Sequence, residues 1–90
     1  MPTIHCVISG RVQGVNYRAA TRDMASQLGL TGWVRNTLDG NVELTATGPE
    51  AALRKLIEWC RQGPPHAAVS NVSTERLPET PFTGFEIRRG

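Results

Sequence analysis

The chain has 90 residues, of which 39% are hydrophobic and 20% are charged, and its formal net charge is +2. The surface scaling of small proteins gives a folded area of roughly 5,200 Å² and burial of roughly 64% of the unfolded surface, which suffices for one two-layer domain over residues 1–90. This composition argues against a disordered, collagen-like or membrane protein. The small net charge argues against a nucleic-acid coat or a membrane-surface anchor.

We expect no targeting segment, because the first five residues lack the basic and apolar runs of a signal peptide. No stretch approaches the roughly 20 apolar residues that span a bilayer. We therefore expect a cytoplasmic protein. Cys6 and Cys60 form neither a Cys-x-x-Cys pair nor a metal-ligand cluster. In a reducing compartment we expect two buried free thiols, with a disulfide bridge as the alternative.

The first third of the chain predicts a strand, a loop and a helix. Residues 4–9 alternate in a way that predicts a strand. Residues 10–17 contain two glycines and predict a loop, and residues 18–28 predict a helix that ends at Gly29, where a left-handed cap is expected. Apolar residues at helical spacing predict its buried stripe, which comprises Tyr17, Ala20, Met24 and Leu28.

A β-hairpin is predicted next, with arms at residues 32–38 and 41–48. Asp39-Gly40 between the arms is a strong signal for a two-residue turn, because both residues tolerate positive φ. The second arm alternates apolar with polar residues, which is typical of a half-buried strand with one solvated face.

A second helix is predicted from Pro49 to about Arg61. Proline is favoured in a first helical turn, and Glu50 suits the positive end of the helix dipole. The segment Gly63-Pro64-Pro65 ends the helix. Its predicted buried stripe comprises Leu53, Leu56, Ile57 and Cys60.

The last part of the chain predicts a strand at residues 69–77, a loop at 78–83 and a short strand at 85–88. Val69 and Val72 do not fit simple alternation in the first of these strands. The complete order predicts an α+β, ferredoxin-like split βαβ sandwich, with two helices on one face of a mainly antiparallel four- to five-stranded sheet. The other face is expected to be polar and solvated. Because this scaffold serves many functions, the fold alone identifies none.

The segment from Gly10 to Arg18 carries the chemical signal. It leaves a strand and enters a helix, where backbone N–H groups have no intrahelical partner and can converge on an anion. Gly10 and Gly14 permit tight turns, and Arg18 adds a fork of donors that matches two phosphoryl oxygens. The segment therefore predicts a phosphate cradle, with an ordinary strand-to-helix turn as the alternative. It lacks the Gly-Lys-Ser/Thr ending of a Walker loop and the glycine spacing of the dinucleotide fingerprint.

Two motifs at a fixed distance resemble the acylphosphatase family. The run Gly-Arg-Val-Gln-Gly-Val-Asn-Tyr-Arg at 10–18 is similar to that family's first signature. The run Gly-Trp-Val-Arg-Asn at 32–36 is similar to its second, as are Asp39-Gly40 and Gly48-Pro49 downstream. The resemblance covers nearly the whole chain. It implies hydrolysis of the carboxyl-phosphate bond of acyl phosphates, such as acetyl phosphate, to a carboxylate and phosphate.

The resemblance also implies roles for individual residues. Arg18 would bind the phosphoryl group and Asn36 would orient the attacking water, so both would be catalytic. The implied phosphate-binding loop comprises Gln13, Gly14, Val15, Asn16, Tyr17 and Arg18. Tyr17 and Trp33 are otherwise expected to be packing residues. Neither signature holds an obvious general base, so the substrate's own phosphate oxygen is the implied base.

The resemblance implies no metal and no cofactor. We expect a small-molecule acyl phosphate as substrate, inorganic phosphate or sulfate as an occupant of the loop, and a monomer without nucleic-acid or membrane partners. Members of the family often end in an aromatic or apolar residue, whereas this chain ends Arg88-Arg89-Gly90. The resemblance therefore gives no role to this ending.

Three other functions use the same fold or loop. An RNA-recognition domain needs aromatic residues on the solvated faces of the two central strands. Those faces are predicted to carry His5, Val7, Ser9, Glu43, Thr45 and Thr47. None of these residues is Phe, Tyr or Trp, which argues against an RNA-recognition domain. A regulatory domain would bind a phosphate-bearing ligand without turnover. A carbamoyl-phosphate-handling part of a maturation system would usually be fused to larger domains.

Overall fold

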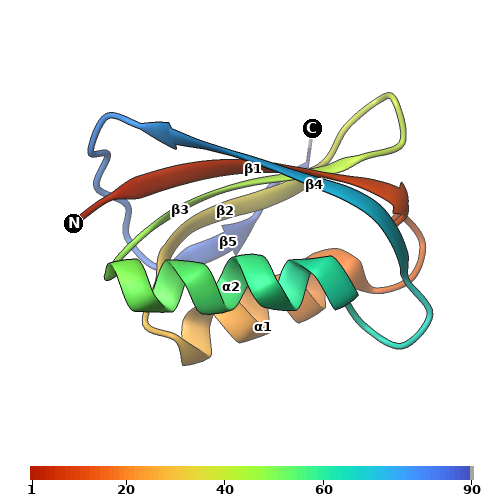
Figure 1. Cartoon of the computed structure of the whole chain (residues 1–90), viewed down its shortest axis with the longest axis horizontal. Helices are drawn as coiled ribbons and strands as arrows, with labels where there is room; N and C mark the ends of the chain where they lie inside the picture. The colour runs from red at the N-terminus through yellow and green to blue at the C-terminus, as the bar shows by residue number, and fades with distance from the viewer. Residues whose placement is uncertain (90) are drawn as a thin grey trace.

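The computed structural model describes residues 1–89, and within them two helices cover one face of a five-stranded sheet (Figure 1). In chain order the elements are β1 (Thr3–Arg11), α1 (Tyr17–Gln27), β2 (Thr31–Asn36), β3 (Val42–Thr47), α2 (Glu50–Gln62), β4 (Ala68–Leu77) and β5 (Phe85–Ile87). The strand order is β4-β1-β3-β2-β5, and every pair is antiparallel except β2 with β5. The predicted ferredoxin-like arrangement is confirmed. Gly90 of the predicted Arg88-Arg89-Gly90 ending lies outside the described residues.

The core lies between the sheet and the two helices. The accessible surface of the whole protein is 5162 Å², which matches the area expected from the chain length. Leu53, Leu56 and Cys60 form the buried stripe of α2, as predicted. The fully buried residues of α1 are Tyr17, Thr21 and Ala25, whereas Met24 and Leu28 of the predicted stripe are partly buried and pack against the core. The Tyr17 ring turns inward and its hydroxyl donates to the carbonyl of Cys60 at 2.6 Å, which sets the rotation of the helix.

The connection between β2 and β3 differs from the predicted two-residue turn. The N–H of Thr37 donates to the carbonyl of Asn41 at 2.9 Å, and the N–H of Gly40 donates to the carbonyl of Thr37 at 3.3 Å. The loop is therefore three residues long, with a left-handed residue after the turn. Gly40 has φ 92°, whereas Asp39 keeps a negative φ. A two-residue type I′ turn needs positive φ at both positions, so it does not form.

The strand β1 runs to Arg11, two residues past its predicted end. Its register with β4 shifts between Ser9 and Gly10, which marks a β-bulge. Gly10 has φ 119°, and a Cβ at this position would lie 2.3 Å from a carbonyl oxygen of β4, so only glycine fits. The bulge explains why Val69 and Val72 break simple alternation, since both pack against the core.

The sheet face opposite the helices carries charged and polar side chains, as expected. Trp33 lies on this face, half-buried, with the guanidinium carbons of Arg35 and Arg88 at 5.6 and 5.1 Å from its ring centre. Nε2 of His5 donates to the carboxylate of Glu43 at 2.8 Å, and Arg35 pairs with the same carboxylate. These contacts give Trp33 the packing role that was predicted for it.

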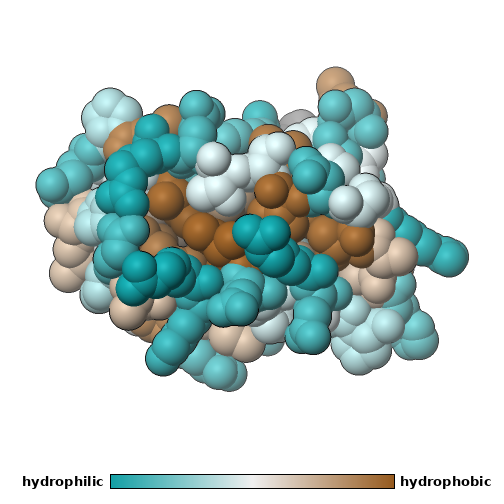
Figure 2. Space-filling view, viewed as in Figure 1, coloured by the Kyte–Doolittle hydropathy of each residue, from teal (hydrophilic) through white to brown (hydrophobic). Residues whose placement is uncertain are grey.

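Seen from the side, hydrophobic residues form a band across the middle, where the sheet meets α2 (Figure 2). Both cysteines, Cys6 and Cys60, are buried free thiols. Within residues 1–89, neither helix has the length and apolar content that crossing a bilayer requires.

Candidate active site

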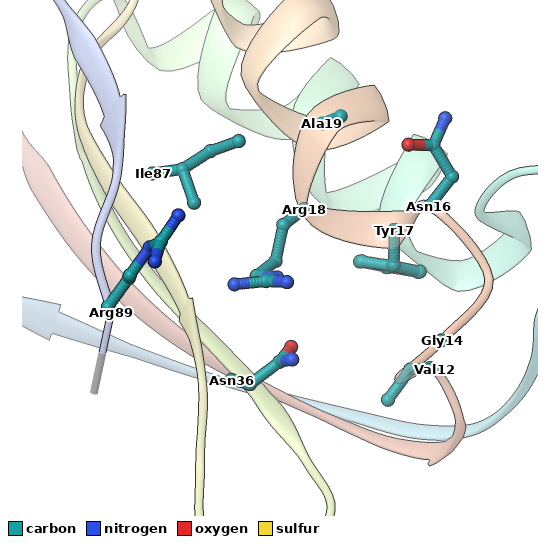
Figure 3. Close-up of a pocket in the computed structure, with 9 residues that line it drawn as sticks. All are labelled: Val12, Gly14, Asn16, Tyr17, Arg18, Ala19, Asn36, Ile87 and Arg89. Carbon is teal, nitrogen blue, oxygen red and sulfur yellow. The ribbon is translucent and has the colours of Figure 1, made fainter.

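A pocket of about 520 Å³ lies between the start of α1 and the ends of β2 and β5 (Figure 3). The segment that joins β1 to α1, residues 12–16, forms one wall and is called the β1–α1 loop below. The pocket is lined by Val12, Gly14, Asn16, Tyr17, Arg18, Ala19, Asn36, Ile87 and Arg89. It therefore contains both residues that were predicted to be catalytic, Arg18 and Asn36.

The topology of the sheet explains why residues far apart in sequence meet here. β1 and β2 both run antiparallel to β3, so their last residues, Arg11 and Asn36, lie at the same end of the sheet. β5 runs parallel to β2, which brings Ile87 to that end as well. The helix α1 begins directly after the β1–α1 loop, so its positive end points to the same place.

The β1–α1 loop presents a series of free backbone donors. In residues 1–89, no backbone N–H from Gln13 to Ala19 donates to another residue; the first main-chain bond at the helix start runs from Ala20 to Asn16, at 3.1 Å. Gly14 and Asn16 are left-handed, with φ 74° and 65°, and residues of negative φ stand between and beside them. Such alternation turns successive N–H groups toward one concavity, which suits an anion.

The start of α1 is also electrostatically prepared for an anion. Asn16 caps the helix without a side-chain hydrogen bond, and the first turn holds no acidic residue. Arg18 stands in this turn, where its positive charge is unfavourable beside the positive end of the helix dipole. No ion pair involves Arg18 within the described chain. A dianion bound here would relieve both the uncapped N–H groups and the unpaired guanidinium.

Asn36 ends β2 and directs its side-chain amide toward the Arg18 guanidinium across the pocket (Figure 3). Its Oδ1 is buried and has no hydrogen-bond partner among residues 1–89. A buried polar atom left in this state costs folding free energy, about 1–3 kcal/mol, and usually has a functional reason.

Gln13 and Val15 belong to the predicted phosphate-binding loop, but their side chains do not line this pocket. Nε2 of Gln13 donates to the carbonyls of Thr37 at 2.9 Å and Asn41 at 2.8 Å. The Gln13 side chain thereby fastens the β1–α1 loop beside the end of β2, a role that sequence reasoning missed. Val15 lines a separate depression of about 470 Å³ together with Arg11 and other loop residues.

Tyr17 contributes a wall of the pocket but no proton chemistry. Its hydroxyl is buried and donates to the Cys60 carbonyl. Burial raises the pKa of Tyr17 far above its ordinary value, and the nearby Cys60 and Cys6 add to this. The phenol therefore stays protonated, and its ring packs at 5.5 Å from the Trp59 ring. The packing role predicted for Tyr17 is confirmed.

The chemistry available in the pocket is anion binding and water orientation. Among the described lining residues there is no carboxylate, imidazole or thiol that could act as a general base. Across residues 1–89, no group of three or more His, Cys, Asp and Glu side chains is placed to hold a metal ion. The polar groups that face the pocket are backbone N–H groups, guanidinium groups and amides.

Comparison with known proteins agrees with this geometry. The family model "Acylphosphatase" matches residues 4–87. The chain is 53% identical over 85 residues to the acylphosphatase of Haloquadratum walsbyi, covering 94% of this chain and 91% of that protein. Its fold matches the solved acylphosphatase from Coxiella burnetii with a TM-score of 0.94 at 45% identity, covering 97% and 92% of the two chains. The solved acylphosphatase from Bacillus subtilis gives 0.95 at 35% identity, covering 98% and 99%.

Proposed function

The chain belongs to the acylphosphatase family and hydrolyses acyl phosphates to a carboxylate and phosphate, and we propose that it does so in the pocket between Arg18 and Asn36, without a metal or cofactor. One observation carries the proposal. Gly14 and Asn16 with free N–H groups, Arg18 with its unpaired guanidinium and Asn36 with its unpartnered Oδ1 all line a single pocket.

In this proposal Arg18 and the β1–α1 loop hold the phosphoryl group. The guanidinium binds two phosphoryl oxygens in a bidentate way, and the backbone N–H groups receive the rest of the charge. Phosphoryl transfer depends on positioning and on spreading charge over the equatorial oxygens, so fixed donors of this kind lower the barrier. The positive end of α1 points at the same oxygens.

Asn36 places the attacking water. Its Oδ1 accepts a hydrogen bond from the water and holds the water oxygen in line with the bond to be broken. The water oxygen forms the new bond to phosphorus, and the bond from phosphorus to the acyl oxygen breaks. The carboxylate leaves without protonation because its conjugate acid has a low pKa. The water proton moves to a phosphoryl oxygen of the substrate, so no side chain serves as base.

The binding partners and the compartment predicted from the sequence extend this proposal. We infer that inorganic phosphate or sulfate occupies the β1–α1 loop, since it shares the charge and shape of the phosphoryl group. Arg18 and Asn36 come from one chain, which supports action as a monomer over one domain, residues 1–90. The buried free thiols of Cys6 and Cys60 support a reducing, cytoplasmic compartment. Neither a nucleic acid nor a membrane has a part in this chemistry.

The test is hydrolysis of acetyl phosphate or benzoyl phosphate in the presence of EDTA. Arg18→Ala is expected to lower binding and turnover together, and Asn36→Ala to lower turnover mainly. Arg22→Ala is the matched control, because Arg22 lies on α1 and pairs with Asp23 at 3.3 Å outside the pocket. Equal rates for the wild type and the Arg18 and Asn36 variants would overturn the site, and loss of activity in EDTA alone would overturn metal independence.

A further inference from the structure

Arg89 brings a second guanidinium to the pocket, from the side opposite the β1–α1 loop. It follows β5, and both Ile87 and Arg89 line the pocket (Figure 3). Arg88 between them points to the other face of the sheet, where it lies 5.1 Å from the Trp33 ring centre and pairs with Glu86 at 3.0 Å. The alternation of β5 therefore continues past its last residue and directs Arg89 into the pocket.

Among the described residues, no carboxylate balances the charge of Arg89 inside the pocket, because none lines it. Arg22, Arg35, Arg76 and Arg88 each pair with a carboxylate. Within residues 1–89, neither Arg18 nor Arg89 takes part in an ion pair. Among the same residues Arg11, Arg54 and Arg61 form no ion pair either, but none of them lines this pocket. Two unpaired cations that share one cavity repel each other, and each is stabilised by an anion placed nearby.

The phosphoryl group does not require Arg89. It offers three terminal oxygens, and the free N–H groups of the β1–α1 loop together with a bidentate Arg18 can supply each of them with donors. The pocket of about 520 Å³ also has room for an acyl group beside the phosphoryl group. Ile87 and Arg89 line the same pocket, so an acyl group that extended along the apolar side chain of Ile87 would come near Arg89.

We propose that Arg89 is a specificity-determining residue that binds a second anionic group, a carboxylate or a phosphate, on the acyl part of the substrate. This inference rests on the proposed function, in which Arg18 and the β1–α1 loop hold the phosphoryl group. The preferred substrates are then acyl phosphates that carry a negative charge at the far end of the acyl group. Acyl phosphates with an uncharged acyl group bind through the phosphoryl group and Ile87 alone.

The experiment compares benzoyl phosphates that differ only in a remote substituent. The 3- and 4-carboxybenzoyl phosphates carry the second charge, and the corresponding carbamoylbenzoyl phosphates have nearly the same shape with an uncharged amide at that position. The rigid ring prevents the remote carboxylate from attacking its own acyl carbon. For the wild type we expect kcat/KM to favour one or both carboxylated substrates by about fivefold, the effect of an exposed ion pair. Added salt should reduce this preference, because the Debye length is about 10 Å at 0.1 M.

Arg89→Gln is expected to bring the ratio of kcat/KM for the carboxylated over the carbamoylated substrates close to one, and Arg89→Lys to restore part of it. Arg88→Gln is the matched control, because Arg88 is the adjacent arginine on the opposite face, and it should keep the wild-type ratio. If Arg89→Gln lowered kcat/KM equally for the carboxylated and the carbamoylated substrates, Arg89 would be assigned to the phosphoryl group. If it lowered kcat/KM for neither, Arg89 would be a solvated side chain without a role in binding. Both results overturn the inference but leave the proposed function intact, whereas no hydrolysis of any benzoyl phosphate by the wild type overturns the proposed function itself.

Discussion

The side-chain amide of Gln13 donates to the backbone carbonyl of Thr37 at 2.9 Å, and this bond links the two halves of the candidate active site. Gln13 belongs to the β1–α1 loop, and Thr37 directly follows Asn36. A second bond, to the carbonyl of Asn41 at 2.8 Å, holds the same amide on the β2–β3 connection. The distance between the proposed phosphate-binding donors and the proposed water-binding amide is therefore fixed in part by a side chain that does not line the pocket.

Gln13→Ala is expected to lower kcat/KM for acetyl phosphate by about tenfold, because small displacements of positioned groups are costly to in-line reactions. Most of the loss should appear in kcat, and the variant should still bind inorganic phosphate through the loop N–H groups and Arg18. Gln27→Ala is the matched control, since Gln27 is exposed at the end of α1. Steady-state kinetics with phosphate inhibition measures both quantities. Unchanged kcat in Gln13→Ala would show that the loop holds its position without this link.

The positions of the helices and strands could be predicted because their signals are local. Apolar periodicity, the cap at Gly29 and the proline before α2 each depend on neighbours in sequence. The prediction of a two-residue turn at Asp39-Gly40 was wrong, because the length of the turn depends on the pairing of Thr37 with Asn41. The most deeply buried residues of α1 include Thr21 and Ala25, which were not predicted, because a hydrogen bond from Tyr17 to α2 fixes the rotation of the helix.

The residues of the candidate site could likewise be predicted where the signal was local, and were missed where it depended on distant contacts. Arg18 and Asn36 could be named because each stands in a signature of recognisable spacing, and their convergence follows from the parallel directions of β1 and β2. The link from Gln13 and the entry of Arg89 into the pocket had no local signal. Each depends on where a segment distant in sequence comes to lie.

Asn36→Ala is expected to separate stability from activity. The substitution removes a buried oxygen that has no partner in the described residues, so the free energy of unfolding should not fall and is expected to rise by about 1 kcal/mol. The value of kcat should fall by about 10²-fold, because a fixed transition-state interaction is lost. Asn71→Ala, on the exposed β4, is the control for both measurements. A marked loss of stability, measured by urea unfolding, would indicate that the amide is a structural contact.

Glu43 gives the fold a defined acid dependence. Partial burial raises the pKa of its carboxyl, but hydrogen bonds from His5 and Arg35 outweigh burial, and the net pKa lies below its ordinary value. A group with a lowered folded-state pKa contributes stability above its unfolded pKa, about 4.3 for Glu. This contribution is lost as the pH falls through the folded pKa.

Glu43→Gln should therefore reduce the free energy of unfolding at neutral pH and flatten its decline between about pH 5 and pH 3. Urea unfolding at several pH values measures the decline. Glu58→Gln is the control, because Glu58 is exposed on α2 and forms no ion pair within residues 1–89. An acid decline in Glu43→Gln as steep as that of the wild type would show that the contacts of Glu43 with His5 and Arg35 do not contribute to stability.

Inorganic phosphate should stabilise the folded protein through the β1–α1 loop. Any ligand that binds only the native state raises the free energy of unfolding by mass action, by about 2.7 kcal/mol at a concentration 100 times Kd. For a domain of this size that corresponds to a rise in Tm of roughly 11–22 °C. Chloride at the same ionic strength should give a much smaller rise, because a single charge without three oxygens cannot satisfy the loop donors. Arg18→Ala should lose most of the phosphate effect, whereas Arg22→Ala should keep it, since Arg22 pairs with Asp23 away from the pocket. If phosphate and chloride gave equal rises in all three proteins, the stabilisation would be general screening of the net charge, and the loop would not be a preformed phosphate site.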